Sequence, residues 1–180
     1  MEDQTHTLVL LVQDHPGVLN RVVSLMRRRS FNIDSITVGH SEQPGVSRMT
    51  IQLRGEPNDV EQAGKHLYKL LEVLKVVDLS DDEAIIRELV MVKVAAKGAV
   101  RAEVVQTASI YGARVLDATP SSLMIEMAGR EDEIESFLAM MRVYGIREMV
   151  RSGKVALARV APSKRGHVER ITDAAFAVAD

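Results

Sequence analysis

Residues 8–22 have the sequence LVLLVQDHPGVLNRV, and this stretch decides how the fold begins. Its first five residues are apolar and partly β-branched, which predicts a strand over residues 8–12. Pro16 and Gly17 mark a tight turn. Beyond the turn, apolar residues recur every three or four positions as far as Met26, the spacing of one helix face. We therefore predict a strand, a turn and a helix.

The following segment completes one structural unit. Alternating polar and apolar residues predict strands over 31–38 and 48–54, joined as a hairpin through the turn at 43–45. A second helix is predicted over 60–74, because Val60, Leu67, Leu71 and Leu74 share one helix face. A short strand over 75–79 closes the unit. The order strand, helix, strand, strand, helix, strand is that of the ferredoxin-like split βαβ motif.

The second half of the chain repeats this order. The predicted elements are a strand over 89–94, a helix over 104–111, strands over 114–117 and 123–127, a helix over 129–141 and a strand over 146–150. The predicted fold class is α+β, with two tandem ferredoxin-like βαββαβ units. We place these domains at residues 6–80 and 84–160, separated by an acidic polar linker. The remaining segment, 161–180, is polar and basic as far as Ile171 and is predicted to be a loosely attached tail. As an alternative, Val168, Ile171, Ala175 and Val178 could mark one side of a helix.

Composition excludes several classes of protein. The 180 residues contain no cysteine, which rules out disulfide scaffolds, thiolate zinc sites and iron–sulfur clusters. A net charge of -2 and 3% aromatic residues argue against nucleic-acid binding. The chain has no apolar run long enough to span a membrane and no recognisable signal peptide. We expect a soluble cytoplasmic protein without nucleic-acid or membrane partners.

The sequence shows no catalytic constellation. None of the five histidines is spaced from another as metal ligands are, and the phosphate-binding glycine loops and the G-x-S-x-G motif are absent. The acidic residues fall on turns and polar helix faces. We therefore predict no catalytic residue and no metal site in this chain.

One segment could bind a small ligand. The amide groups of Gly17, Val18 and Leu19 lie at a predicted helix start, where unpaired N–H groups favour an anion such as a carboxylate. Asp14 adds a negative charge that could receive an ammonium group. Together these groups match the headgroup of an amino acid. A turn with a helix cap and no ligand explains the same residues, and the residues alone leave both interpretations open.

Several stretches resemble a known family. They are residues 14–19, with the pattern D-x-P-G-x-L, and residues 17–22, 31–39, 47–51, 66–70, 73–79, 87–94, 117–121 and 151–157. In this order they resemble the regulatory small subunit of acetolactate synthase, also called acetohydroxyacid synthase. The first unit resembles an ACT domain. The resemblance runs from about Thr7 to Arg159.

The resemblance implies a non-catalytic regulatory subunit. Its partner would be a large subunit that uses thiamine diphosphate, Mg²⁺ and FAD to condense two pyruvates, or pyruvate with 2-oxobutyrate. The small subunit would raise the activity of that partner and confer feedback inhibition by valine or another branched-chain amino acid. No cofactor is expected in this chain itself.

The resemblance also implies an effector site between two ACT domains. Asp14, Gly17, Val18 and Leu19 would come from one chain, and Asn32, Ile33 and Val38 from its neighbour. We therefore expect a homodimer or a higher oligomer. A separate argument is that Val9 and Leu11 are apolar although they point away from the predicted helices, so this sheet face should be covered.

Three other functions are compatible with parts of this pattern. A free-standing ACT-type amino-acid sensor would act on a different enzyme. A transcriptional regulator would need a DNA-reading helix, and the sequence contains no helix-turn-helix pattern. An enzyme on a ferredoxin-like fold would need a convergent polar cluster, since the fold alone does not determine function.

Overall fold

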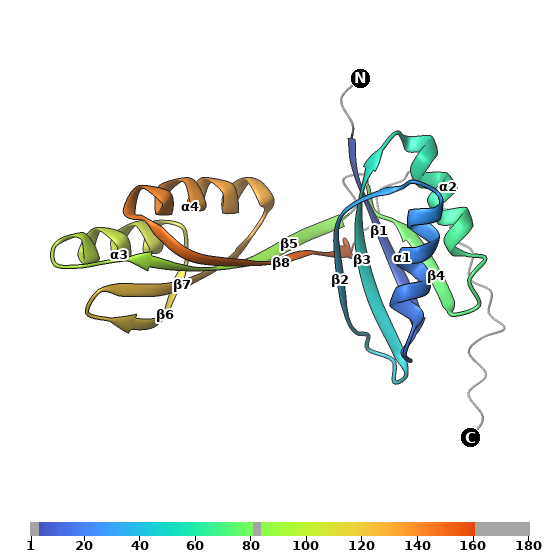
Figure 1. The fold of residues 1–180 in the computed structure, drawn as a ribbon, viewed down its shortest axis with the longest axis horizontal. Helices are drawn as coiled ribbons and strands as arrows, with labels where there is room; N and C mark the ends of the chain where they lie inside the picture. Colours follow the sequence, from blue (N-terminus) through green and yellow to red (C-terminus); the bar gives the residue numbers. More distant parts are fainter. Residues whose placement is uncertain (1–3, 81–83, 161–180) are drawn as a thin grey trace. The chain divides into compact units, whose positions relative to one another are not determined.

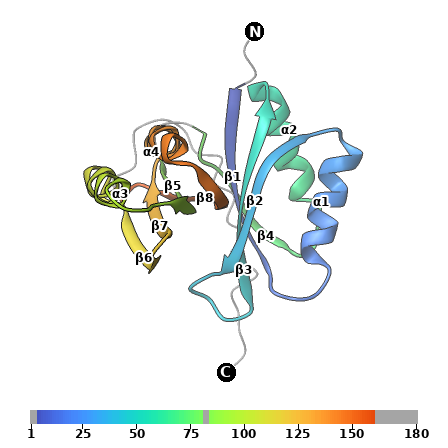
Figure 2. The ribbon, with the colours of Figure 1, turned by 60° about the vertical axis from the view of Figure 1, so that its left-hand side comes forward.

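The computed structural model describes residues 4–80 and 84–160. The chain divides into two compact units, and Ile86–Val155 form the second of them. Each unit contains a four-stranded sheet. In each unit the two helices lie on one face of the sheet (Figures 1 and 2). The predicted α+β fold class with two tandem ferredoxin-like units is confirmed.

The first unit has the element order β1, α1, β2, β3, α2, β4. The bounds are β1 Gln4–Gln13, α1 Val18–Arg28, β2 Asn32–His40, β3 Val46–Gly55, α2 Pro57–Leu67 and β4 Val73–Asp78. The strands are arranged β2-β3-β1-β4, so β1 is central and β2 lies at an edge. β1 pairs antiparallel with both β3 and β4.

Alternation along β1 builds the core of the first unit. Leu8, Leu10 and Val12 are at most 1% exposed and pack into one cluster with Val22 and Met26 of α1. Because successive strand residues point to opposite faces, this set lies on the side covered by the helices. The sequence pattern from residue 8 onward therefore predicts this core correctly.

The second unit repeats the arrangement with different lengths. Its elements are β5 Ala84–Ala95, α3 Val100–Ile110, β6 Arg114–Thr119, β7 Ser122–Gly129, α4 Glu131–Tyr144 and β8 Ile146–Ala158. The strand order is β6-β7-β5-β8, which corresponds strand for strand to the first sheet. Phe137 is fully buried, and its ring meets that of Tyr111 edge to face, with 5.7 Å between the centroids.

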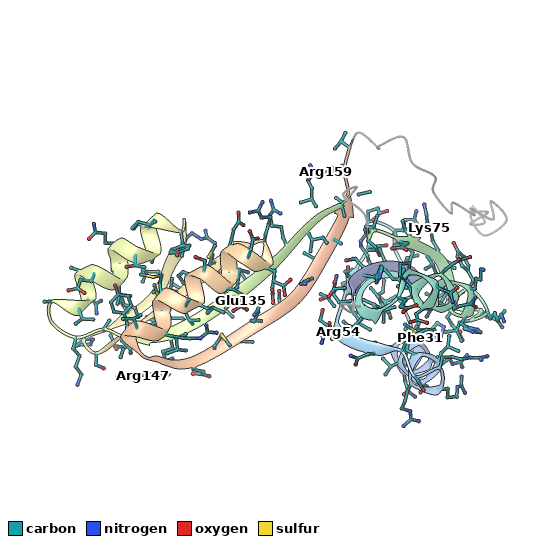
Figure 3. All side chains as sticks on the ribbon, turned by 90° about the horizontal axis from the view of Figure 1, so that it is seen from above. Phe31, Arg54, Lys75, Glu135, Arg147 and Arg159 are labelled. Atoms are coloured by element: carbon teal, nitrogen blue, oxygen red, sulfur yellow. The ribbon has the colours of Figure 1, made fainter. Side chains whose placement is uncertain are left out.

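A buried ion pair joins two strands of the second unit. Glu88 on β5 is 6% exposed, and both of its carboxylate oxygens accept hydrogen bonds from Arg151 on β8 at 2.7 Å. Arg151 also donates to Glu135, which Figure 3 shows on α4. These acceptors raise the pKa of the Arg151 guanidinium. Paired acceptors are what a buried charge requires to be stable.

The predicted end of the second helix is wrong. α2 ends at Leu67, whereas the prediction continued to residue 74. Leu71 is 91% exposed, and Leu74 belongs to β4. The hydroxyl of Tyr68 lies 3.2 Å from both the amide and the carbonyl of Val76, so it ties the turn after α2 to β4. The helical spacing of these leucines is coincidental.

The two apolar residues on the other face of β1 differ in exposure. Val9 is 2% exposed within the single chain, whereas Leu11 is only half-buried, so this face of β1 is covered in part. Exposed apolar residues on α1 and β2 include Leu19, Val23 and Val38, which are 43%, 37% and 43% exposed. No helix in the described ranges is long and apolar enough to cross a membrane. The predicted tail, residues 161–180, lies outside the described residues.

Candidate functional site

The turn between β1 and α1 is held from two sides. The amide of Gln13 donates to the carbonyl of Glu72, just before β4, at 2.9 Å. The amide of Asp14 donates to the carbonyl of Gly45, in the β2–β3 hairpin, at 2.8 Å. Arg21 on α1 forms an ion pair with the buried carboxylate of Glu72. Contacts distant in sequence therefore fix the turn that carries Asp14 and Gly17.

Gly17 begins the helix without a side-chain cap. It is the N-cap residue of α1, with φ 94° and ψ -14°, and no side chain bonds to the helix start. A side chain with a Cβ is strained at this φ, which explains the glycine. A Cβ placed there would meet no atom within 4 Å, so the space above the turn is open.

Two of the three predicted amides are available to a ligand. In the described part of the chain, the N–H groups of Gly17 and Leu19 have no hydrogen-bond partner. The Val18 amide differs from the prediction, because it makes a long bond of 3.5 Å to the carbonyl of His15. The Val18 side chain is 3% exposed and belongs to the core, whereas the Leu19 side chain is 43% exposed.

Asp14 pairs with a histidine instead of capping the helix. Its Oδ2 atom lies 3.1 Å from Nδ1 of His40, the last residue of β2. The exposed fractions of the two side chains are 40% for Asp14 and 89% for His40. The carboxylate is therefore accessible from solvent and close to the open helix start. An acid, two amides and the exposed Leu19 thus lie on one turn.

The predicted β2 residues lie at both ends of the strand. Val38 is two residues before His40 and pairs with the core residue Met49, so its side chain is on the helix-covered face. Asn32 and Ile33 begin the strand, six and five residues before Val38. At about 3.3 Å per residue, Asn32 lies roughly 20 Å from Val38. One chain does not bring Asn32 and Ile33 to the turn that carries Asp14.

His40 is the site residue that the sequence did not reveal. It is 26 positions from Asp14, and no local pattern links the two residues. The hydrogen bond depends on β2 ending beside the β1–α1 turn. The neighbouring His15 is engaged within the turn, with ring nitrogens 3.2 Å from the Pro16 carbonyl and from Oε1 of Gln13. A strand-end histidine facing a turn acid could be found only after the strand order was known.

The remaining titratable groups add no second site. Within residues 4–80 and 84–160, no three His, Asp or Glu residues are arranged to hold a metal ion. Hydrogen bonds from Arg130 lower the pKa of Asp132, and a hydrogen bond from Lys93 lowers that of Glu148. Both carboxylates belong to surface ion pairs of the second unit. These shifts have structural causes.

Comparison with known proteins assigns both units to the same protein family. Residues 8–75 match the family model described as AHAS small subunit-like ACT domain, and residues 87–160 match the model described as small subunit of acetolactate synthase. A probable acetolactate synthase small subunit of Methanothermobacter thermautotrophicus is 45% identical over 160 residues, covering 88% of this chain and 95% of the relative. The chain belongs to the acetolactate synthase small-subunit family.

Other members of the small-subunit family support the assignment along the chain. The acetolactate synthase small subunit of Mycobacterium bovis is 42% identical over 159 residues, covering 88% of this chain and 95% of its own length. The crystal structure of the small subunit from Thermotoga maritima superimposes with a TM-score of 0.82 at 35% identity. That match covers 87% of this chain and 98% of the other. Membership of this family implies a large catalytic subunit as partner.

Proposed function

We propose that this chain is the non-catalytic regulatory subunit of an acetolactate synthase and acts in the cytoplasm. It would raise the activity of a large subunit that holds thiamine diphosphate, Mg²⁺ and FAD. It would also confer feedback inhibition by valine or another branched-chain amino acid. The observation that carries the regulatory part is the exposed pairing of an acid with an uncapped helix start, Asp14 beside Gly17, in the ACT unit.

The chemistry of the turn suits an α-amino acid. The free amides of Gly17 and Leu19 would bind the ligand carboxylate, assisted by the positive end of the helix dipole. Asp14 would accept a hydrogen bond from the ligand ammonium. The exposed side chains of Leu19 and Val38 offer apolar surface for a short aliphatic side chain. Val18 would contribute through its backbone, since its side chain is in the core.

A homodimer would complete the site. β2 is an edge strand, and edge strands can pair with a second copy of the same chain. If two copies of β2 run antiparallel about a two-fold axis, the beginning of one strand faces the end of the other. Asn32 and Ile33 of the second chain would then approach Val38 and the Asp14 turn of the first. In this arrangement, the beginning of β2 in one chain and the end of β2 in the other would line the same effector site.

The test is reconstitution with the large subunit. We expect the purified chain alone to form no acetolactate from pyruvate, and its addition to raise the rate of the large subunit. Valine should lower the raised rate towards that of the large subunit alone, because inhibition requires the effector to favour one state of the complex. Leucine and isoleucine are the comparison ligands. Stimulation without inhibition by any of the three would contradict the effector function and leave the subunit function intact.

A further inference from the structure

The Asp14 carboxylate already has a partner in the absence of ligand. His40 lies 3.1 Å from its Oδ2 atom, and both side chains are reached by solvent. An incoming ammonium group would approach this same carboxylate. The Asp14 carboxylate would therefore be shared between His40 and the ligand ammonium group. The charge on His40 would determine how much negative charge the carboxylate offers to that ammonium group.

The other charged groups nearby have different partners. Arg21 is paired with Glu72, and His15 is bonded within the turn. Glu42 of the hairpin acts on Arg48 of β3, whose pKa is lowered by burial and partly restored by that negative charge. Among the described residues, Asp14 is the charged group in contact with His40.

We propose that His40 is a positioning residue of the effector site that couples amino-acid binding to proton release. A protonated imidazole neutralises Asp14, so the ligand ammonium must displace it. A neutral imidazole leaves the full negative charge of the carboxylate available to the ligand. The inference rests on the proposed effector function, and it adds a residue and a proton linkage that membership of the family does not supply.

The direction of the effect follows from linkage. An imidazole changes its charge between about pH 5 and 8, whereas the ammonium and carboxylate of a free amino acid keep theirs. Binding weakened by the protonated form must become stronger as the pH rises. Because the pair is exposed, we expect valine affinity to increase about two- to fivefold from pH 5.5 to 7.5, the size typical of a surface ion pair. Binding at the lower pH should release protons.

The experiment is calorimetric titration of the purified full-length chain with valine at pH 5.5, 6.5 and 7.5. Repeating each titration in two buffers of different ionisation enthalpy measures the protons released. His40→Gln should bind equally at all three values, near the wild-type affinity at pH 7.5. His40→Lys, which carries a permanent charge, should bind equally weakly at all three. His15→Gln is the matched control and should retain the wild-type dependence.

If His40 had a purely structural role, the valine affinities of His40→Gln and His40→Lys would not differ according to the charge of the new side chain. The inference is overturned if wild-type binding is independent of pH, or if the pH dependence survives in His40→Gln. Thermal melting of each variant checks the fold, which a substitution at an 89% exposed side chain should leave intact. Absence of valine, leucine and isoleucine binding to the wild-type chain at every pH would instead overturn the proposed effector function itself, and this inference with it.

Discussion

The turn after β1 and the turn after β5 have the same backbone scaffold. Gln13 donates to the loop before β4 at 2.9 Å, and Ala95 donates to the loop before β8 at 3.0 Å. The next amides, of Asp14 and Ala96, donate to the hairpins β2–β3 and β6–β7 at 2.8 and 3.0 Å. These paired hydrogen bonds establish that Asp14 and Ala96 are equivalent positions in the two units.

The side chains at these equivalent positions differ completely. Asp14 presents an exposed carboxylate beside His40, whereas Ala96 is fully buried in the core of the second unit. The turn geometry is thus a property of the βαββαβ scaffold, whereas the exposed acid occurs in one copy of it. The amino-acid site proposed for the first turn therefore has no counterpart of Asp14 in the second unit.

The largest expected effect tests whether the two units depend equally on their buried carboxylates. Arg151→Met leaves Glu88 buried without its main partner, and an unsatisfied buried group costs about 1–3 kcal/mol of unfolding free energy. Arg21→Met should cost less, because the Arg21 side chain is 60% exposed and that of Arg151 only 27%. Amide hydrogen exchange within 86–155 measures the first loss and exchange within 4–80 the second.

The matched control for this comparison is Arg130→Met. The Arg130 side chain is 58% exposed and its partner Asp132 is also on the surface, so the expected change is close to zero. Equal losses in Arg151→Met and Arg130→Met would show that burial of Glu88 does not matter. A larger loss for Arg21→Met than for Arg151→Met would reverse the comparison between the two units.

An intermediate effect is expected at Gly17 and Gly98, the glycines of the two equivalent turns. Aspartate at these positions tests backbone strain and effector binding separately. Gly17→Asp places a side chain at φ 94° and should cost about 1–2 kcal/mol of stability. Gly98→Asp should cost less, because its φ of 55° lies within the left-handed region that aspartate tolerates. Only Gly17→Asp should weaken valine inhibition of the reconstituted enzyme, since its carboxylate would oppose that of the effector.

The two glycine variants control for each other. A Cβ atom added at either position would have no atom within 4 Å, so steric conflict does not distinguish them. Thermal melting of the two variants gives the stability difference, and a valine titration of the holoenzyme gives the inhibition constant. An unchanged inhibition constant in Gly17→Asp would remove the helix start of α1 from the effector site.

The smallest effect is an acid sensitivity of the second unit. Hydrogen bonds from Arg130 and Lys93 depress the pKa of Asp132 and Glu148 in the folded state. The contribution of such carboxylates is present above their unfolded pKa values, near 4, and is lost as the pH falls through the lower folded values. Protection of the amides within 86–155, taken relative to the intrinsic exchange rate at each pH, should therefore decrease slightly below about pH 4. In the double variant Asp132→Asn, Glu148→Gln, the protection of these amides should depend less steeply on pH. The same steepness in the variant and the wild type would contradict this cause.

The sequence predicted the elements whose apolar spacing matches their burial. The alternation of Leu8, Leu10 and Val12 identified β1, and the helical spacing after Gly17 identified α1, because in both cases one face enters the core. The same reasoning extended α2 beyond its end. Leu71 continues the helical spacing but is 91% exposed, since the Tyr68 hydroxyl fixes the chain in a turn.

The candidate site was predicted in part. The open helix start at Gly17 follows from local sequence, since proline, glycine and an apolar helix face are adjacent along the chain. The partner of Asp14 does not, because His40 reaches it through strand pairing that brings distant segments together. The apolar Val9 did indicate a covered sheet face, and Val9 is 2% exposed, but alternation along a strand does not predict which segment provides the cover.

The central position of β1 and β5 also constrains how each sheet can form. β1 is synthesised first, yet its neighbours β3 and β4 begin at residues 46 and 73, so its hydrogen bonds close loops of tens of residues. Folds dominated by such distant pairings fold slowly compared with helical bundles. During synthesis, β1 can pair with β3 once Val46–Gly55 has left the ribosome, but its other edge stays unpaired until Val73–Asp78 follows. One edge of the apolar strand β1 is therefore open to other chains during this interval, and the same delay recurs when β5 waits for β8.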